Sequence, residues 1–203
     1  VDLLVDRHDV LWAATPQGLW RLARGSAKQV RSGDIRSLAL AGDVLWVRTR
    51  NDGLWKIVGD RISAHPDAPG CKGSWVATHQ AGDLYTSCAQ GIWRWDAAAL
   101  QWSRISDAIG VGPLHLDRDG AVWFGSREGL TRWHEGRTEV RRGELKLPDW
   151  RMRAFHRDSA GDLAGQAQHL SGDLAGIGQV LLEGVLTPEA LGDPALGAHL
   201  PRA

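Results

Sequence analysis

The feature that most constrains the fold is a hairpin pattern that occurs four times in the chain. Its clearest copy is LDRDGAVWFGSREGLTRW at residues 116–133. Asp side chains can bond the backbone of the first turn, and Gly120 can adopt a positive φ angle without steric cost. The alternation from Ala121 to Ser126 is typical of a strand, and a second turn at 127–129 leads into a returning strand. The segment therefore predicts a β-hairpin.

Three earlier segments carry the same pattern, namely DVLWAATPQGLWRL at 9–22, DVLWVRTRNDGLWKI at 43–57 and DLYTSCAQGIWRW at 83–95. In each copy an aromatic residue is followed seven or eight residues later by Leu or Ile, which comes directly after Gly. The four aromatic residues, at intervals of 34, 39 and 38, are Trp12, Trp46, Tyr85 and Trp123. An internal period of this length fits one four-stranded propeller blade.

The predicted strands carry large apolar groups on both faces, as in Leu45-Trp46-Val47, so each sheet must be covered on both sides. Packing blade against blade around an axis satisfies this need. The sequence predicts an all-β β-propeller with four clear blades and a degenerate fifth, or an arc of a larger propeller. The repeats lie near 4–40, 41–78, 79–115 and 116–155, the degenerate repeat at 156–186, and an extended tail at 187–203. A linker is the alternative for the degenerate repeat, where Ala164 replaces the expected Trp.

The order Asp, turn, Gly, aliphatic residue, Trp, two residues, Ser or Thr, and then Gly-Leu resembles the two-component regulator propeller repeat. This repeat occurs in the extracytoplasmic sensor regions of bacterial histidine kinases and diguanylate cyclases. The resemblance covers about residues 4–150, roughly three quarters of the chain, although copies one to three lack the full Asp-x-Asp-Gly turn. It implies a non-enzymatic sensor propeller of a signal-transduction protein that binds a ligand or partner in the periplasm or another extracytoplasmic compartment.

Composition limits the classes of partner that this chain is expected to bind. The 24 basic and 24 acidic residues balance, which does not favour a nucleic acid or an anionic membrane as a partner. The sequence contains no run of eighteen apolar residues and no signal-peptide pattern at its start. Because it begins at Val1 rather than Met, we expect a processed or excised chain. The expected partners are a small-molecule or glycan ligand, the remaining blades of a larger propeller, or a second copy in a homodimer. No cofactor is expected.

The two cysteines, Cys71 and Cys88, have two interpretations. They are either small buried apolar residues or a disulfide, because the hairpin that turns at 80–83 could bring them together. A disulfide would fit an oxidising compartment. A metal site is not predicted, since no second Cys pair or His pair lies at ligand spacing.

The candidate ligand-binding residues are those expected on the blade rim or along the central channel. Arginines can hold an acidic group through bidentate hydrogen bonds, and tryptophans can stack on a sugar. These residues are Arg48, Arg50, Trp75, Arg127, Trp150, Arg151, Arg153, His115 and His156. The competing interpretation is a solvated rim in which Arg stems cover apolar surface, with the histidines as ordinary strand residues.

An enzyme is the alternative function. The sequence offers no Ser-His-Asp order, nucleophile elbow or phosphate loop, so no catalytic residue is assigned. A propeller lyase resembling the streptogramin lyases would use His115 or His156 as a base together with a divalent cation. The sequence favours the binding module over this enzyme.

Overall fold

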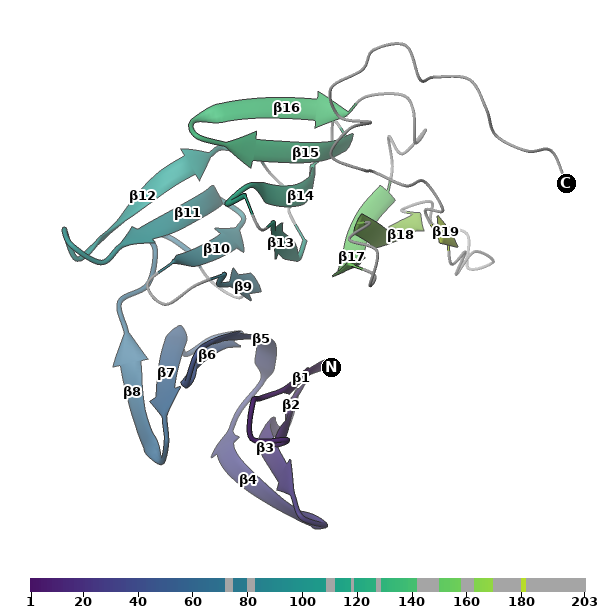
Figure 1. Cartoon of the computed structure of the whole chain (residues 1–203). Coiled ribbons are helices and arrows are strands. Elements are labelled where there is room, and N and C mark those ends of the chain that lie inside the picture. The colour runs from purple at the N-terminus through teal and green to yellow at the C-terminus, as the bar shows by residue number, and fades with distance from the viewer. Residues whose placement is uncertain are drawn as a thin grey trace, which may run out of the picture.

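The computed structural model describes residues 1–71, 75–79, 83–108, 112–117, 119–126, 129–141, 150–157, 163–169 and 180–181. These residues form four four-stranded antiparallel sheets and a fifth sheet of three strands, which follow one another in chain order (Figure 1). No helix occurs among them. Accordingly, this part of the chain offers no helical segment long and apolar enough to cross a bilayer.

Each sheet is a simple meander of consecutive strands. Blade 1 comprises β1 (Asp2–Val5), β2 (Leu11–Thr15), β3 (Gly18–Ala23) and β4 (Ser26–Ser32). Blade 2 comprises β5 (Ile35–Ala41), β6 (Val44–Thr49), β7 (Leu54–Val58) and β8 (Arg61–His65). Blade 3 comprises β9 (Trp75–Ala77), β10 (Leu84–Cys88), β11 (Gly91–Asp96) and β12 (Gln101–Ser106). Blade 4 comprises β13 (Leu114–Leu116), β14 (Val122–Ser126), β15 (Gly129–His134) and β16 (Arg137–Arg141). The fifth sheet comprises β17 (Trp150–Arg157), β18 (Leu163–His169) and β19 (Val180–Leu181).

The first strands of the blades lie side by side along the inside of the arc. Strand β5 contacts both β1 and β9, and β9 contacts β13 (Figure 1). Side chains of one inner strand bond the backbone of the next: the Asp2 carboxylate accepts a hydrogen bond from the Leu38 N–H at 2.8 Å, and the Ser37 hydroxyl oxygen accepts one from the Val76 N–H at 2.9 Å. The all-β propeller with four clear blades that the repeats predicted is confirmed, and the strands of the fifth sheet favour a degenerate blade over a linker.

The apolar core lies between the blades rather than within them. Side chains of blades 1 and 2 form one cluster, and comparable clusters join blade 2 to blade 3 and blade 3 to blade 4. The aromatic repeat residues Trp12, Tyr85 and Trp123 are buried, whereas Trp46 is half-buried. Blades 2 and 3 are therefore covered on both faces, as the doubly apolar strands predicted.

The turn before the Trp strand is held by its aspartate. The Asp6 carboxylate accepts hydrogen bonds from the backbone N–H of His8 and Val10, and from the Trp12 indole at 2.9 Å. Burial acts to raise the pKa of Asp6, but the hydrogen bonds from Trp12, His8 and Val10 outweigh it, so this pKa lies below the ordinary value of 3.8. Asp6 therefore fixes both the turn and the first aromatic residue of blade 1.

The sheets begin earlier than the repeat boundaries that we placed near 4–40, 41–78, 79–115 and 116–155. Blade 2, for example, starts at Ile35 rather than 41. The reason is that the inner strand of each sheet precedes the Trp hairpin that makes the repeat recognisable. The predicted tail at 187–203 lies outside the described residues.

Candidate functional site

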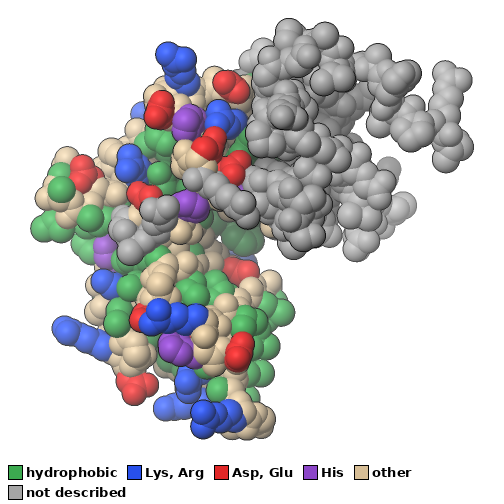
Figure 2. Space-filling view, viewed as in Figure 1, with side chains coloured by type: hydrophobic (Ala, Val, Ile, Leu, Met, Phe, Trp, Pro, Cys, Tyr) green, Lys and Arg blue, Asp and Glu red, His purple; other side chains and the backbone are tan. Residues whose placement is uncertain are grey.

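Loops that could bind a ligand lie together at one end of the blades. Connections alternate between the two ends of an antiparallel meander, so the turns between second and third strands lie at the same end as the inter-blade connections. Backbone hydrogen bonds join the two sets: Gly33 donates to Gln17 at 3.3 Å, and Arg50 donates to Asp34 at 2.8 Å. We call this end the connection end. Figure 2 shows charged side chains of both signs over the coloured part of the visible surface.

At the connection end of blade 2, two arginines share one carboxylate. The Arg50 Nε and the Arg36 Nη2 both lie 3.3 Å from Asp34 Oδ2. The side chain of Arg50 is 57% exposed and that of Arg36 is 36% exposed. One carboxylate cannot neutralise two guanidinium groups, so this Asp34 group carries a net positive charge that faces solvent. It can accept an anionic ligand through charge-assisted hydrogen bonds.

A further arginine nearby, Arg31, is held in an ion pair and a ring contact. The Arg31 Nη2 lies 3.2 Å from Asp52 Oδ2, and its guanidinium carbon lies 3.8 Å from the centroid of the Trp55 ring. The Trp55 indole donates to the Asp52 carbonyl at 3.0 Å. Stacking and pairing together leave this arginine 20% exposed, so it stiffens the turn between β6 and β7 instead of offering a free cation.

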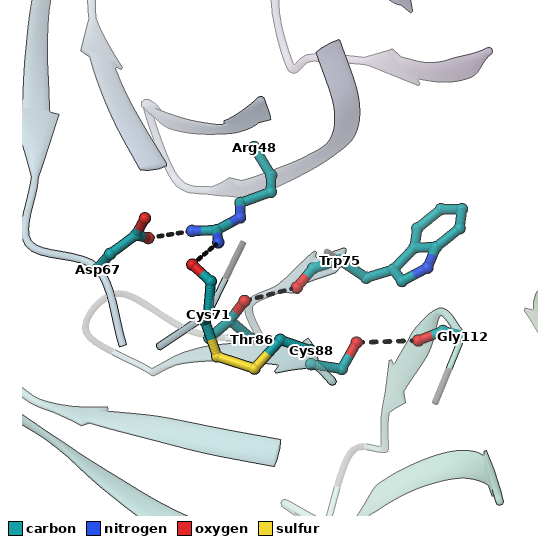
Figure 3. Close-up of a disulfide and its surroundings, with 8 residues drawn as sticks. Arg48, Asp67, Cys71, Trp75, Thr86, Cys88 and Gly112 are labelled. Atoms are coloured by element: carbon teal, nitrogen blue, oxygen red, sulfur yellow. Dashed lines mark hydrogen bonds and ion pairs between the residues drawn. A yellow bond between two sulfur atoms is a disulfide. The ribbon is translucent and has the colours of Figure 1, made fainter. Parts of the chain in front are cut away.

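Arg48 does not lie on an exposed rim, which corrects the placement expected from the sequence. Its side chain is fully buried and forms an ion pair with Asp67, and its Nη2 donates to the Cys71 carbonyl at 3.1 Å (Figure 3). Both partners belong to the connection between blades 2 and 3. Arg48 therefore anchors that connection from inside the molecule.

The same connection is tied to blade 3 by a disulfide between Cys71 and Cys88 (Figure 3). Their Cα atoms lie 5.4 Å apart, within the range of protein disulfides. Of the two interpretations of these cysteines, the structure gives the disulfide. A further hydrogen bond, from the Trp102 indole to the Pro66 carbonyl at 2.8 Å, holds the start of the connection.

Trp75 and His115 lie on inner strands. Trp75 begins β9, where its carbonyl accepts a hydrogen bond from the Thr86 hydroxyl at 2.9 Å, and its half-buried indole points away from the disulfide (Figure 3). His115 is half-buried in β13, where it pairs with Trp123 of β14. Its ring centroid lies 6.1 Å from that of Phe155 in β17. His115 therefore lies between blade 4 and the fifth sheet.

The remaining predicted residues cannot be assembled into a site. Arg127 lies outside the described residues. The backbone places Trp150 and Arg151 at the start of β17 and Arg153 in the irregular step of that strand. His156 pairs with Ala164, in the same register as His115 with Trp123. The structure does not describe the side chains of Trp150, Arg151, Arg153 and His156. The binding roles of these residues stay predictions, as does the lyase alternative.

Sequence reasoning missed Asp34 and Arg36. Arg36 occupies an irregular step in the pairing of β5 with β6, between Ile35 and Ser37, which sequence alternation does not reveal. The available signal was the Gly-Asp pair that directly precedes an inner strand. In the described part of the chain, no group of three or more His, Cys, Asp or Glu side chains is placed to hold a metal ion.

No family model matches the chain, and no curated protein sequence matches it. Solved structures do. The extracellular domain of BT4673 from B. thetaiotaomicron, described as a one-component system, is similar with a TM-score of 0.68 and 18% identity over 89% of this chain and 28% of that chain. The extracellular domain of the hybrid two-component system BT3049 from the same organism has a TM-score of 0.62 and 14% identity over 85% of this chain and 28% of that chain.

The similarity extends to propellers of other descriptions. A protein described as a gluconolactonase has a TM-score of 0.60 and 13% identity, over 80% of this chain and 69% of that chain. WD40 propellers are also similar. The chain spans 28% of the length of each of the two sensor domains. At these identities the comparisons show the fold, and the fold is a β-propeller.

Proposed function

We propose that this chain is part of a non-enzymatic β-propeller sensor region of a bacterial signal-transduction protein, and that it binds an anionic ligand at the connection end. The observation that carries the ligand class is the Asp34 group, in which Arg36 and Arg50 share one carboxylate and keep a net positive charge at the surface. A small carboxylate and an acidic glycan both supply the bidentate acceptor that a guanidinium prefers. The sensor role is supported by the repeat pattern and by the similarity to sensor domains.

We also propose that the chain works in the periplasm or another extracytoplasmic compartment. The disulfide between Cys71 and Cys88 supports this location, because such bonds persist where thiols are not kept reduced. The similar structures from B. thetaiotaomicron are extracellular domains, which agrees with it. Thiol titration of the denatured chain purified from the periplasm should find no free thiol before reduction and two after it. Two free thiols before reduction would contradict the location.

Ligand binding can be tested by isothermal titration with an oligogalacturonate, against the neutral oligogalactose as control. We expect the acidic oligomer to bind and the neutral one to bind much more weakly. The Arg50→Ala change should weaken binding roughly tenfold or more, the loss expected when one charge-assisted hydrogen bond is removed. Citrate, titrated in parallel, distinguishes a small carboxylate ligand from a glycan.

The matched control is Arg61→Ala, which removes an exposed arginine at the opposite end of the same blade. It should leave affinity unchanged. If neither acid binds, or if Arg50→Ala and Arg36→Ala bind as the unmodified chain does, the Asp34 group is not the site. Trp150→Ala and Arg151→Ala test in the same titration whether the start of β17 contributes.

A further inference from the structure

Blade 1 has one face that packs against blade 2 and one face that no other described blade covers. Residues that pair directly across an antiparallel sheet point to the same side, and the pairs Leu3 with Ala13 and Val5 with Leu11 define this second side. The pairing continues into β3 through Trp20 and Leu22. We call this side the free face; it consists of Leu3, Val5, Leu11, Ala13, Trp20 and Leu22.

The same six positions exist in blade 2, where they form an inter-blade contact. Blade 2 repeats the pairing pattern position by position, with Leu38 opposite Val47 and Leu40 opposite Leu45. The six equivalents are Leu38, Leu40, Leu45, Val47, Trp55 and Ile57. All six belong to the apolar cluster that joins blade 2 to blade 1. On blade 1 the side that covers them carries Leu4, Trp12, Ala14 and Leu19.

Exposure differs sharply between the two equivalent faces. Leu38 is 7% exposed, whereas its counterpart Leu3 is 60% exposed; Val5, the counterpart of the half-buried Leu40, is 61% exposed. Single exposed apolar residues are ordinary, but a contiguous apolar sheet face with an aromatic residue is a contact surface. Blade 1 therefore presents an inter-blade interface that lacks its second half.

We propose that the occupant of the free face is a further propeller blade whose covering side resembles that of blade 1, with an aromatic residue at the position of Trp12 and small or branched apolar residues around it. The inference follows from continuity, since a side of this kind covers the equivalent positions in blade 2. It does not depend on ligand binding at the connection end.

Hydrogen bonds between the inner strands indicate a polar residue that the occupying blade should carry. In two successive inter-blade contacts, the preceding blade supplies a side-chain oxygen to the next inner strand: Asp2 to the Leu38 N–H and Ser37 to the Val76 N–H. Leu3 is the register equivalent of Leu38 and Val76. The occupying blade should therefore carry Asp, Ser or Thr at the position of Asp2.

The fifth sheet does not match this description. Its register places His156 opposite Ala164, the pair equivalent to Leu4 and Trp12 in blade 1. The sequence thus supplies neither the aromatic nor the aliphatic residue that covers the face in blade 2. The occupant is a different blade, with the composition of blades 1 and 2.

The test appends a second copy of residues 1–34 to the start of the full chain, so that the copy can pack on the free face at the spacing found between blades 1 and 2. We expect the extended chain to be monomeric in sedimentation velocity, with a Tm at least about 4 °C above that of the unmodified chain. Because the appended copy covers the original free face but presents an identical one of its own, fluorescence of the apolar dye ANS should stay near that of the unmodified chain. It should be about half that of a control whose appended copy cannot pack, which leaves two such faces open. The matched control carries Trp12→Glu and Leu19→Glu in the appended copy only.

The result that would overturn the proposal is an extended chain whose Tm and dye binding equal those of this control. Concentration-dependent dimerisation of the unmodified chain, abolished by Leu3→Glu, would also overturn it, because the occupant would then be a second copy. A pair of substitutions in the unmodified chain keeps the test valid if the extended chain folds poorly. Leu3→Glu should leave its Tm within a few degrees and Leu38→Glu should unfold it; equal losses would show that the free face is already covered.

Discussion

Removal of the Asp67 carboxylate should be among the most damaging single changes in this chain. Its partner Arg48 has a side chain that is 0% exposed, so Asp67→Ala leaves a buried guanidinium with the Cys71 carbonyl as its remaining acceptor. Breaking a buried ion pair from one side costs about 3–5 kcal/mol. Because the Asp67 side chain is itself 34% exposed, water can partly replace it, and the lower end of this range applies.

The companion change Arg48→Met distinguishes the effect of the buried charge on stability from the effect of side-chain packing. Methionine can fill much of the arginine stem without a buried charge, and buried pairs are often replaced by apolar residues at little cost. The double variant Arg48→Met with Asp67→Ala should therefore be more stable than Asp67→Ala alone, by roughly 2 kcal/mol. Urea unfolding followed by tryptophan fluorescence gives the free energy of unfolding for each variant.

The control for this cycle is Asp43→Ala, which removes a carboxylate from an ion pair with Arg7 whose side chains are 50% and 60% exposed. It should cost less than about 1 kcal/mol, as exposed pairs do. Two results would refute the reasoning. One is an Asp67→Ala chain whose free energy of unfolding lies within about 1 kcal/mol of that of the unmodified chain, and the other is a double variant that is less stable than Asp67→Ala alone.

Three further changes probe the turns and the disulfide. The Asp6→Ala change should cost roughly 1–3 kcal/mol of stability, because it leaves the Trp12 indole without its acceptor. Since the pKa of Asp6 is lowered in the fold, this contribution is present above about pH 4 and is lost as the pH falls below it. Urea unfolding at pH 7 and pH 3 should therefore show a smaller stability difference between the two chains at the lower pH. The Gly91→Ala change should lower the Tm by several degrees in calorimetry, because Gly91 has a φ of +119° and an added Cβ would collide with the Ser106 carbonyl oxygen. Reducing the disulfide, which spans 17 residues, should cost about 3 kcal/mol in urea unfolding, and equal stability with and without reductant would contradict its structural role.

The fold was predictable because its signals are local. The aromatic residue, the turn glycine and the apolar alternation of each hairpin lie within about eighteen residues, so one copy such as 116–133 contains the information for a whole hairpin. Four copies in register then specify sheets that must cover one another. The disulfide was open to inference for the same reason, since Cys71 and Cys88 flank a single hairpin.

The site was less predictable because its partners come from different strands. Arg48 was expected at the surface, since nothing near it in the sequence indicates that Asp67, nineteen residues later, turns back to meet it. The Asp34 group was missed because it needs both an irregular step at Arg36 and the proximity of Arg50, which directly follows the neighbouring strand β6. Contacts of this kind follow from three-dimensional packing and leave no periodic trace.

The unequal cover of the blades predicts where the chain opens first. In repeat architectures stability is roughly the sum of each unit and its contacts with neighbours, so a blade packed on one side is the least stable. Blade 1 has its free face exposed, whereas every residue of β10 in blade 3 is buried. Amides of β1 and β2 should therefore exchange with solvent well before those of β6 and β10 in hydrogen-exchange mass spectrometry. Equal protection of β2 and β10 would mean that the interfaces do not contribute separately, and the interchangeable-blade account of this chain would fail.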